Sequence, residues 1–100
     1  MRPNNTKKLI VGEKFFYSLA LLPLTPCEYK CILTLLEYGE CTQIQLSNKL
    51  DIARQNINKA INHLEKLGVI EKMRIEGRNI FFCVNTNFEI HDFDKNQLLF

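Results

Sequence analysis

The sequence lacks the features of several large classes of protein. None of its apolar runs approaches the roughly 18 residues that a membrane-spanning helix needs, and the start, MRPNNTKK, lacks the apolar segment of a secretory signal. It has no glycine-rich phosphate loop, no HExxH or paired-carboxylate pattern and no evident internal repeat. We therefore expect a cytoplasmic protein that is not an enzyme, uses no cofactor and has no membrane partner.

Length and charge narrow the classes further. A chain of 100 residues with 46% hydrophobic content suits one domain with a modest core and leaves no room for an appended effector domain. The net charge is only +2, but residues 1–14 and 54–79 each carry +3, whereas residues 26–53 and 85–100 each carry −2. Positive charge gathered in separate segments is typical of a protein that meets a phosphate backbone there.

The stretch from Thr42 to Gly68, TQIQLSNKLDIARQNINKAINHLEKLG, predicts two helices joined by a sharp turn. Thr42 and Gln45 have the spacing of a capping box. From Ala53 to Leu67 apolar residues recur at helical spacing, and Gly68 stands at the C-terminal cap position. The opposite face of this second helix has no acidic residue and consists of Gln55, Asn58, Lys59, Asn62 and Lys66.

This polar face has two interpretations. Asn and Gln present a donor and an acceptor together to an adenine edge, and Lys reaches guanine acceptors or phosphates, so the face suits the major groove of DNA. The alternative is an ordinary solvated surface in a protein whose source is rich in Asn and Lys codons. We favour the groove because of the segment that follows.

Residues 69–84, VIEKMRIEGRNIFFCV, predict a β-hairpin, because two β-rich runs flank the turn from Glu76 to Asn79, which contains Gly77. Together with the preceding helix, INHLEKLGVIEKMRIEGRNIFFCV resembles the winged helix-turn-helix family of bacterial, plasmid and phage DNA-binding proteins, in particular its MarR-like and ArsR-like members. The resemblance covers Pro26 to Val84, about three fifths of the chain.

The resemblance implies a mostly helical α+β fold with a three-helix core, a β-hairpin wing and terminal extensions. It also implies that the helix from Ala53 to Leu67 enters the major groove and that the wing approaches the backbone or minor groove. The expected DNA-binding residues are Arg54, Gln55, Asn58, Lys59, Asn62, Lys66, Lys72, Arg74 and Arg78. Many relatives have Ser or Thr where this chain has Ala53, so we expect a weak N-terminal cap and doubt the phosphate contact often made there.

The other segments are expected to support this core. Residues 1–8 form a flexible basic arm, and residues 9–24 form an apolar lead-in that is either a strand or a short packed helix. The winged-helix core spans residues 26–84. Its first helix is expected from Pro26 to Tyr38, with Pro26 at the first position and a second capping box between Thr25 and Glu28. A C-terminal extension over residues 85–100 is expected to contain a short strand from Phe88 to Ile90.

The first core helix is apolar on two faces. One stripe is expected to pack under the helix-turn-helix and consists of Tyr29, Ile32, Leu33 and Leu36. The second stripe consists of Cys27, Cys31, Leu35 and Tyr38. We expect the second stripe to be covered either by the lead-in and the C-terminal tail or by a second subunit. The resemblance implies a homodimer, and the apolar end, Leu98 to Phe100, either packs against a partner or marks the cut edge of a longer protein.

Cys27, Cys31, Cys41 and Cys83 raise the question of a metal or redox site. Cys27 and Cys31 are four residues apart, a spacing at which two thiolates can share an ion. However, His63 and His91 show no ligand spacing to the cysteines, and the cysteine pair of ArsR-like sensors has no counterpart between Ala53 and Leu67. We therefore expect reduced, buried thiols and no metal.

Three functions fit these observations. The preferred one is a small dimeric repressor of transcription that binds a pseudo-palindromic site in double-stranded DNA. The alternatives are the DNA-binding module of a plasmid or phage replication or partition protein, and a winged helix used only for protein-protein contacts. Inverted half-sites favour the first, tandem repeats favour the second, and a lack of salt-dependent DNA binding favours the third.

Overall fold

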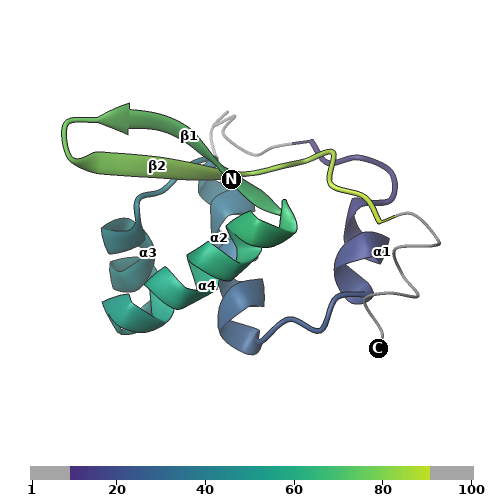
Figure 1. The fold of residues 1–100 in the computed structure, drawn as a ribbon, viewed down its shortest axis with the longest axis horizontal. Coiled ribbons are helices and arrows are strands. Elements are labelled where there is room, and N and C mark those ends of the chain that lie inside the picture. Colours follow the sequence, from purple (N-terminus) through teal and green to yellow (C-terminus); the bar gives the residue numbers. More distant parts are fainter. Residues whose placement is uncertain (1–9, 91–100) are drawn as a thin grey trace, which may run out of the picture.

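The computed structural model describes residues 10–90. Its elements are α1 (Phe15–Ala20), α2 (Pro26–Tyr38), α3 (Gln43–Leu50), α4 (Arg54–Leu67), β1 (Ile70–Glu76) and β2 (Asn79–Val84). The hairpin lies across one side of α2, α3 and α4, and α1 lies at the end of the molecule opposite the hairpin tip (Figure 1). This is the mostly helical α+β winged helix-turn-helix that the sequence predicts. The predicted basic arm, His91 and the apolar tail lie outside the described residues.

Both predicted capping boxes are present. Thr25 Oγ1 accepts a hydrogen bond from the Glu28 N–H at 3.2 Å, and Glu28 Oε1 accepts one from the Thr25 N–H at 2.8 Å. Thr42 and Gln45 make the same reciprocal pair at 3.1 and 3.0 Å. Because each box satisfies an N–H group that the helix end would leave unpaired, α2 and α3 start where the sequence places them.

The turn between α3 and α4 is closed by local contacts. Asp51 adopts the left-handed conformation, with φ 57°, which Asp tolerates better than most residues. The Ser47 hydroxyl donates to the Ile52 carbonyl at 2.6 Å. α4 then begins at Arg54 without a side-chain cap on Ala53, as the sequence predicts. These contacts fix the direction in which α4 leaves α3.

The wing is a twisted hairpin joined to the helices at its base. β1 and β2 pair antiparallel, with a register shift between Lys72 and Arg74, and Gly77 takes a positive φ of 64° in the predicted turn. The Cys41 N–H donates to the Phe82 carbonyl at 3.1 Å, and the Phe82 N–H donates to the Cys41 carbonyl at 2.9 Å. Cys41 therefore adds one paired residue beside β2 and connects the wing to the α2–α3 connection.

α2 buries a broader face than the expected stripe, of which Ile32 is buried and Tyr29 and Leu36 pack against the core. Cys31, Ile32 and Leu35 are at most 1% exposed, whereas Leu33 is 59% and Tyr38 is 48% exposed. The prediction that Leu33 packs under the helix-turn-helix is wrong. In the second stripe, Cys31 and Leu35 are covered within their own chain, so Leu35 needs no second subunit to cover it, whereas Tyr38 stays about half exposed. The physical reason is that α2 crosses the middle of the fold, where α4, α3 and β2 all contact it, so its inner face is broad.

The lead-in forms the short helix α1 and packs against its own chain. Phe15, Leu19 and Leu22 are buried, and the Tyr29 hydroxyl lies 3.1 Å from the Leu19 carbonyl and 3.2 Å from the Leu22 carbonyl. Of the two predicted alternatives, the packed helix is therefore correct. Within residues 10–90 no helix is long and apolar enough to cross a membrane.

The segment after β2 is not a strand. The Ile90 N–H donates to the Ser18 hydroxyl at 3.0 Å, and the Phe88 N–H donates back to the Asn85 carbonyl at 3.0 Å. Phe88 and Ile90 pack against the core, so their alternation reflects burial without strand pairing. The predicted strand from Phe88 to Ile90 is wrong.

A substitution at Leu35 tests the corrected position of α2. Leu35→Glu places an unpaired carboxylate in the core and should lower the free energy of unfolding by about 3 to 5 kcal/mol or more, a large part of the roughly 5 to 15 kcal/mol of a small domain. Leu33→Glu, two residues away and exposed, should change it little. Urea denaturation of both variants measures this, and equal stabilities would contradict the burial of Leu35.

Candidate nucleic-acid interface

α4 separates its residues into a buried side and an exposed side. Ile57, Ala60, Ile61 and Leu64 are buried. The residues predicted to read DNA from this helix are all outside the core, at its solvent side: Arg54, Gln55, Asn58, Lys59, Asn62 and Lys66. The structure therefore presents amides and cations together on the surface of one helix whose other side is held by the core. That these side chains contact DNA is still a prediction from the sequence.

Arg74, one of the predicted wing residues, is engaged by acidic side chains. Its Nε and Nη2 donate to the Glu40 carboxylate at 3.1 and 2.7 Å, and its Nη1 lies 3.2 Å from Glu76 Oε2. The guanidinium carbon lies 3.9 Å from the centre of the Phe81 ring, a cation–π contact. The hydrogen bond with Glu40 raises the pKa of Arg74 above its ordinary value. Arg74 thus links β1 to Glu40, the residue before Cys41.

The other two wing residues have fewer partners. Lys72 Nζ lies 4.0 Å from Glu65 Oε2 of α4, at the limit of an ion pair. Arg78 is exposed in the turn, and among the residues that the structure describes no hydrogen bond or ion pair engages its side chain. Arg78 is therefore the wing cation that is most available to an external anion.

A hollow of about 220 Å³ lies where the wing meets the helix-turn-helix. Its lining comes from the start of α3, the start of α4 and the wing, and consists of Thr42, Gln43, Ile44, Arg54, Arg78, Asn79, Ile80 and Phe82. The structure therefore brings Arg54 and Arg78, which belong to separate elements, to the same concave surface.

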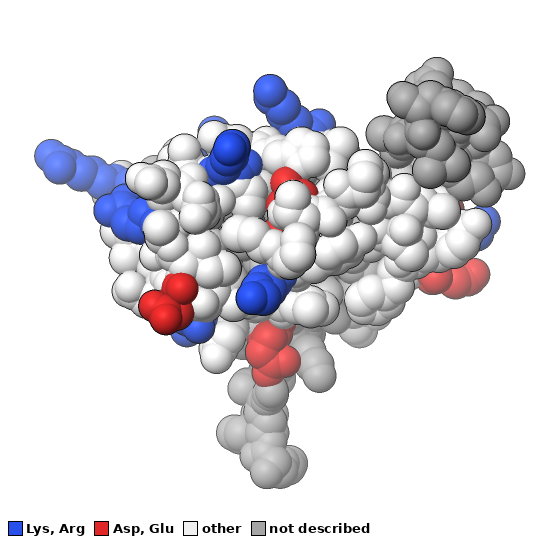
Figure 2. Space-filling view, turned by 90° about the horizontal axis from the view of Figure 1, so that it is seen from below, with Lys and Arg blue, Asp and Glu red and all other residues white. Residues whose placement is uncertain are grey.

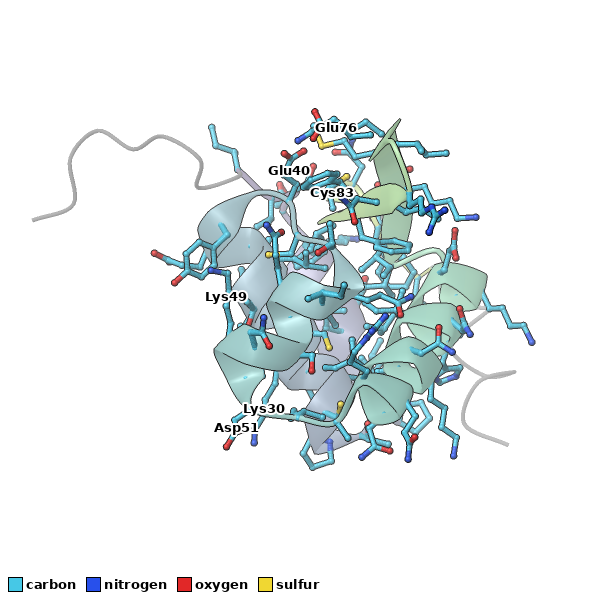
Figure 3. All side chains as sticks on the ribbon, turned by 90° about the vertical axis from the view of Figure 1, so that its left-hand side faces the viewer. Lys30, Glu40, Lys49, Asp51, Glu76 and Cys83 are labelled. Carbon is cyan, nitrogen blue, oxygen red and sulfur yellow. The ribbon has the colours of Figure 1, made fainter. Side chains whose placement is uncertain are left out.

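Charges are distributed unevenly over the rest of the surface. On the side facing away from the hairpin, basic side chains project at separate points with acidic ones between them, so the described residues form no dense basic patch on that side (Figure 2). Seen from the α3 side, Glu40 and Glu76 lie at the wing end with Cys83, while Lys30 and Asp51 lie at the opposite end (Figure 3). Favourable contact with a polyanion therefore depends on local placement more than on total charge.

A buried carboxylate holds α4 against α2. Glu28 is 5% exposed, and its Oε2 lies 2.5 Å from His63 Nδ1, while its Oε1 completes the cap of α2. The sequence predicts only the capping role of Glu28 and predicts no partner for His63. No local pattern links the two residues, because 35 positions separate them.

The cysteines divide into two buried and two half-buried thiols. Cys31 and Cys41 are buried, whereas Cys27 and Cys83 are intermediate. Burial raises the pKa of the Cys31 thiol to about 12, so this thiol stays protonated near neutral pH. Within residues 10–90 no group of three or more His, Cys, Asp or Glu side chains is placed to hold a metal ion.

The chain has two helices, α3 and α4, joined by a sharp turn. A β-hairpin follows them, and it is hydrogen-bonded near its base to Cys41, which precedes α3. This arrangement defines a winged helix-turn-helix protein. Residues 24–77 match the family model described as the MarR family. Since this match spans more than half of the chain, the protein belongs to the MarR family.

The fold is similar to solved structures of low sequence identity. The YusO protein from Bacillus subtilis is 14% identical, with a TM-score of 0.62 over 86% of this chain and 60% of that one. A mutant form of ZitR from Lactococcus lactis is 22% identical, with a TM-score of 0.59 over 63% and 44%. The adhesin competence repressor AdcR from Streptococcus pyogenes is 19% identical, with a TM-score of 0.59 over 72% and 55%. The chain spans between 44% and 60% of the length of these relatives. No curated protein sequence matches it.

Among the described residues Arg74 has acidic partners and Arg78 has none, and this difference gives a prediction within one hairpin. Arg78→Ala should weaken binding to all DNA sequences and lower the slope of log K against log salt concentration by roughly one counterion, because a phosphate contact is lost. Arg74→Ala is the matched change and should leave that slope unaltered, since Glu40 and Glu76 already neutralise Arg74. Fluorescence anisotropy at several salt concentrations measures both slopes. A slope that falls for Arg74→Ala but not for Arg78→Ala would reverse this assignment.

Proposed function

We propose that the protein is a sequence-specific regulator of transcription that binds double-stranded DNA by placing α4 in the major groove, and that it acts in the cytoplasm as a repressor. The observation that carries this proposal is the exposed face of α4, which combines amides and cations with no acidic residue among them. Membership of the MarR family supports the regulatory role. One structural relative, AdcR, is an adhesin competence repressor, and this likeness supports repression.

The chemistry of the face assigns each residue a role. Asn58, Asn62 and Gln55 offer a paired donor and acceptor that match the adenine edge, and Lys59 reaches a guanine acceptor or a phosphate. Lys66, at the C-terminal end of α4, approaches the backbone. On the wing, Arg78 and Lys72 face the backbone or minor groove, while Arg74 positions β1 through Glu40.

Base reading by α4 can be tested on one helix. Asn58→Ala or Asn62→Ala should cost about 1 to 3 kcal/mol of binding free energy for the preferred site and little for random DNA, because a base contact is lost while phosphate contacts remain. The preferred site is first obtained by selecting bound DNA from a random pool. Anisotropy titrations with both DNAs measure the two losses.

Asn56→Ala is the matched control, because Asn56 lies on the same helix but on its α2 side, about 20° on the helix circumference from His63, which contacts Glu28 of α2. It should leave both affinities nearly unchanged. Equal losses on preferred and random DNA for Asn58→Ala and Asn62→Ala would remove their base-reading role. Inverted half-sites in the selected DNA support a repressor, and tandem repeats support a replication or partition module.

The regulator acts as a homodimer in this proposal. Leu35 no longer supports a dimer, because it is buried within its own chain. The support comes from α1, which buries Phe15 and Leu19 but leaves Phe16 and Tyr17 each 56% exposed. A two-fold pair would present two copies of α4 to major grooves about 34 Å apart and double the phosphate contacts of a weakly charged chain.

Phe16→Glu tests the dimer. The added charge on the outer side of α1 should give a folded monomer with much weaker affinity for the preferred site, because one of two half-sites is lost. Leu33→Glu, on the exposed side of α2, is the control and should remain dimeric. Sedimentation velocity measures the assembly state. An unmodified protein that is monomeric at tens of micromolar would contradict the proposal.

A further inference from the structure

We propose that the hollow between α3, α4 and the wing binds a single phosphate of the DNA backbone, held jointly by Arg54 and Arg78. The inference rests on the proposed DNA binding and specifies one backbone contact within it. It assigns the two arginines to the same phosphate, although they belong to different elements of the fold.

The first argument is that two unneutralised cations share one concave surface. Arg54 and Arg78 both line the hollow and are both exposed. Within residues 10–90 no hydrogen bond or ion pair engages either side chain. An anion bound in the hollow would be attracted by both guanidinium groups.

The second argument is the contrast with Arg74. Arg74 lies four residues before Arg78 in the same hairpin, yet Glu40 and Glu76 both contact its guanidinium. The fold thus supplies carboxylates to the arginine outside the hollow and none to the two arginines that line it. A guanidinium matches phosphate oxygens as well as carboxylate oxygens and binds them through paired N–H donors.

The remaining lining is compatible with a phosphate. Gln43 and Ile44 begin α3, and the Thr42 hydroxyl accepts from the Gln45 N–H, so the first two N–H groups of the helix stay open to an acceptor. Among residues 10–90, no acidic residue lines the hollow. Its volume of about 220 Å³ is several times the roughly 30 Å³ that one water molecule occupies in the liquid, so a tetrahedral phosphate group can enter.

A phosphate in this position would join three elements. It would contact the start of α3, the start of α4 and the wing turn at once, and so fix how deeply the N-terminal end of α4 enters the groove. The contact would also replace one that this chain lacks, because Ala53 provides no hydroxyl at the start of α4. The hollow then supplies the backbone contact that a capping Ser or Thr would otherwise make.

The test is a comparison of salt slopes for single and double variants on the selected DNA site. Arg54→Ala and Arg78→Ala should each lower the slope by about 0.9, the value for one phosphate in duplex DNA. In the proposed site the phosphate is held only while both guanidinium groups contact it, so the slope of the double variant should also fall by about 0.9, and its affinity should fall by about the same factor as that of either single variant. Both side chains are exposed, so the variants should keep the unmodified fold, and circular dichroism checks this.

The matched control is the pair Arg78→Ala and Lys66→Ala. Lys66 lies at the other end of α4 and outside the hollow. The double variant of Lys66 and Arg78 should therefore lower the salt slope by about 1.8. Ethylation interference gives a second readout. Arg54→Ala and Arg78→Ala should abolish interference at one and the same phosphate of each half-site.

The shared site would be overturned if the Arg54 and Arg78 double variant lowered the salt slope by about 1.8 and interference were lost at two different phosphates. That result would leave base reading by Asn58 and Asn62 intact, so only the hollow would fail. Binding by the unmodified protein that shows neither salt dependence nor a preferred site would instead contradict the proposed function, and the hollow with it.

Discussion

The backbone pair between Cys41 and Phe82 is the constraint on which the arrangement of wing and helices depends. A two-stranded hairpin alone is marginally stable in water and has no fixed direction relative to the helices. Here both hydrogen bonds of the pair lie in the core, where Cys41 is 1% and Phe82 is 3% exposed, so breaking them would leave buried polar groups unpaired. Arg74 and Glu40 extend the same connection by one residue at the surface.

Acidic residues explain how a chain of net charge +2 can keep cations available for a polyanion. Glu40 and Glu76 form ion pairs with Arg74, and Glu28 contacts His63. These carboxylates are thereby committed to partners inside the protein, whereas Arg54 and Arg78 have none among residues 10–90. Exposed charges are screened over about 10 Å at 0.1 M salt, so a nearby phosphate senses this local imbalance more than the total.

Features set by neighbouring residues were predictable, and features set by distant ones were not. Thr25, Thr42 and Gly77 each act within a few residues, so the starts of α2 and α3 and the hairpin turn followed from the sequence. The face of α4 was predictable because its apolar spacing is unambiguous. α2 is apolar on two sides, and only the crossing of other elements decides that Leu35 is buried and Leu33 exposed. The Arg74–Glu40 contact and the shared hollow likewise join positions far apart in the chain.

The sector of α4 that we propose to face DNA lies away from the core, between two contacts to neighbouring elements. The core takes one side of the helix, and polar contacts to neighbouring elements lie on both flanks: His63 contacts Glu28 of α2, and Glu65 approaches Lys72 of β1. At about 100° per residue, His63 and Glu65 lie about 160° apart on the helix circumference. The arc between them, on the side away from the core, holds the amides and lysines assigned to the groove. Because both flanks and the core fix the rotation of α4 about its axis, the exposed arc keeps one orientation, as reading a base edge requires.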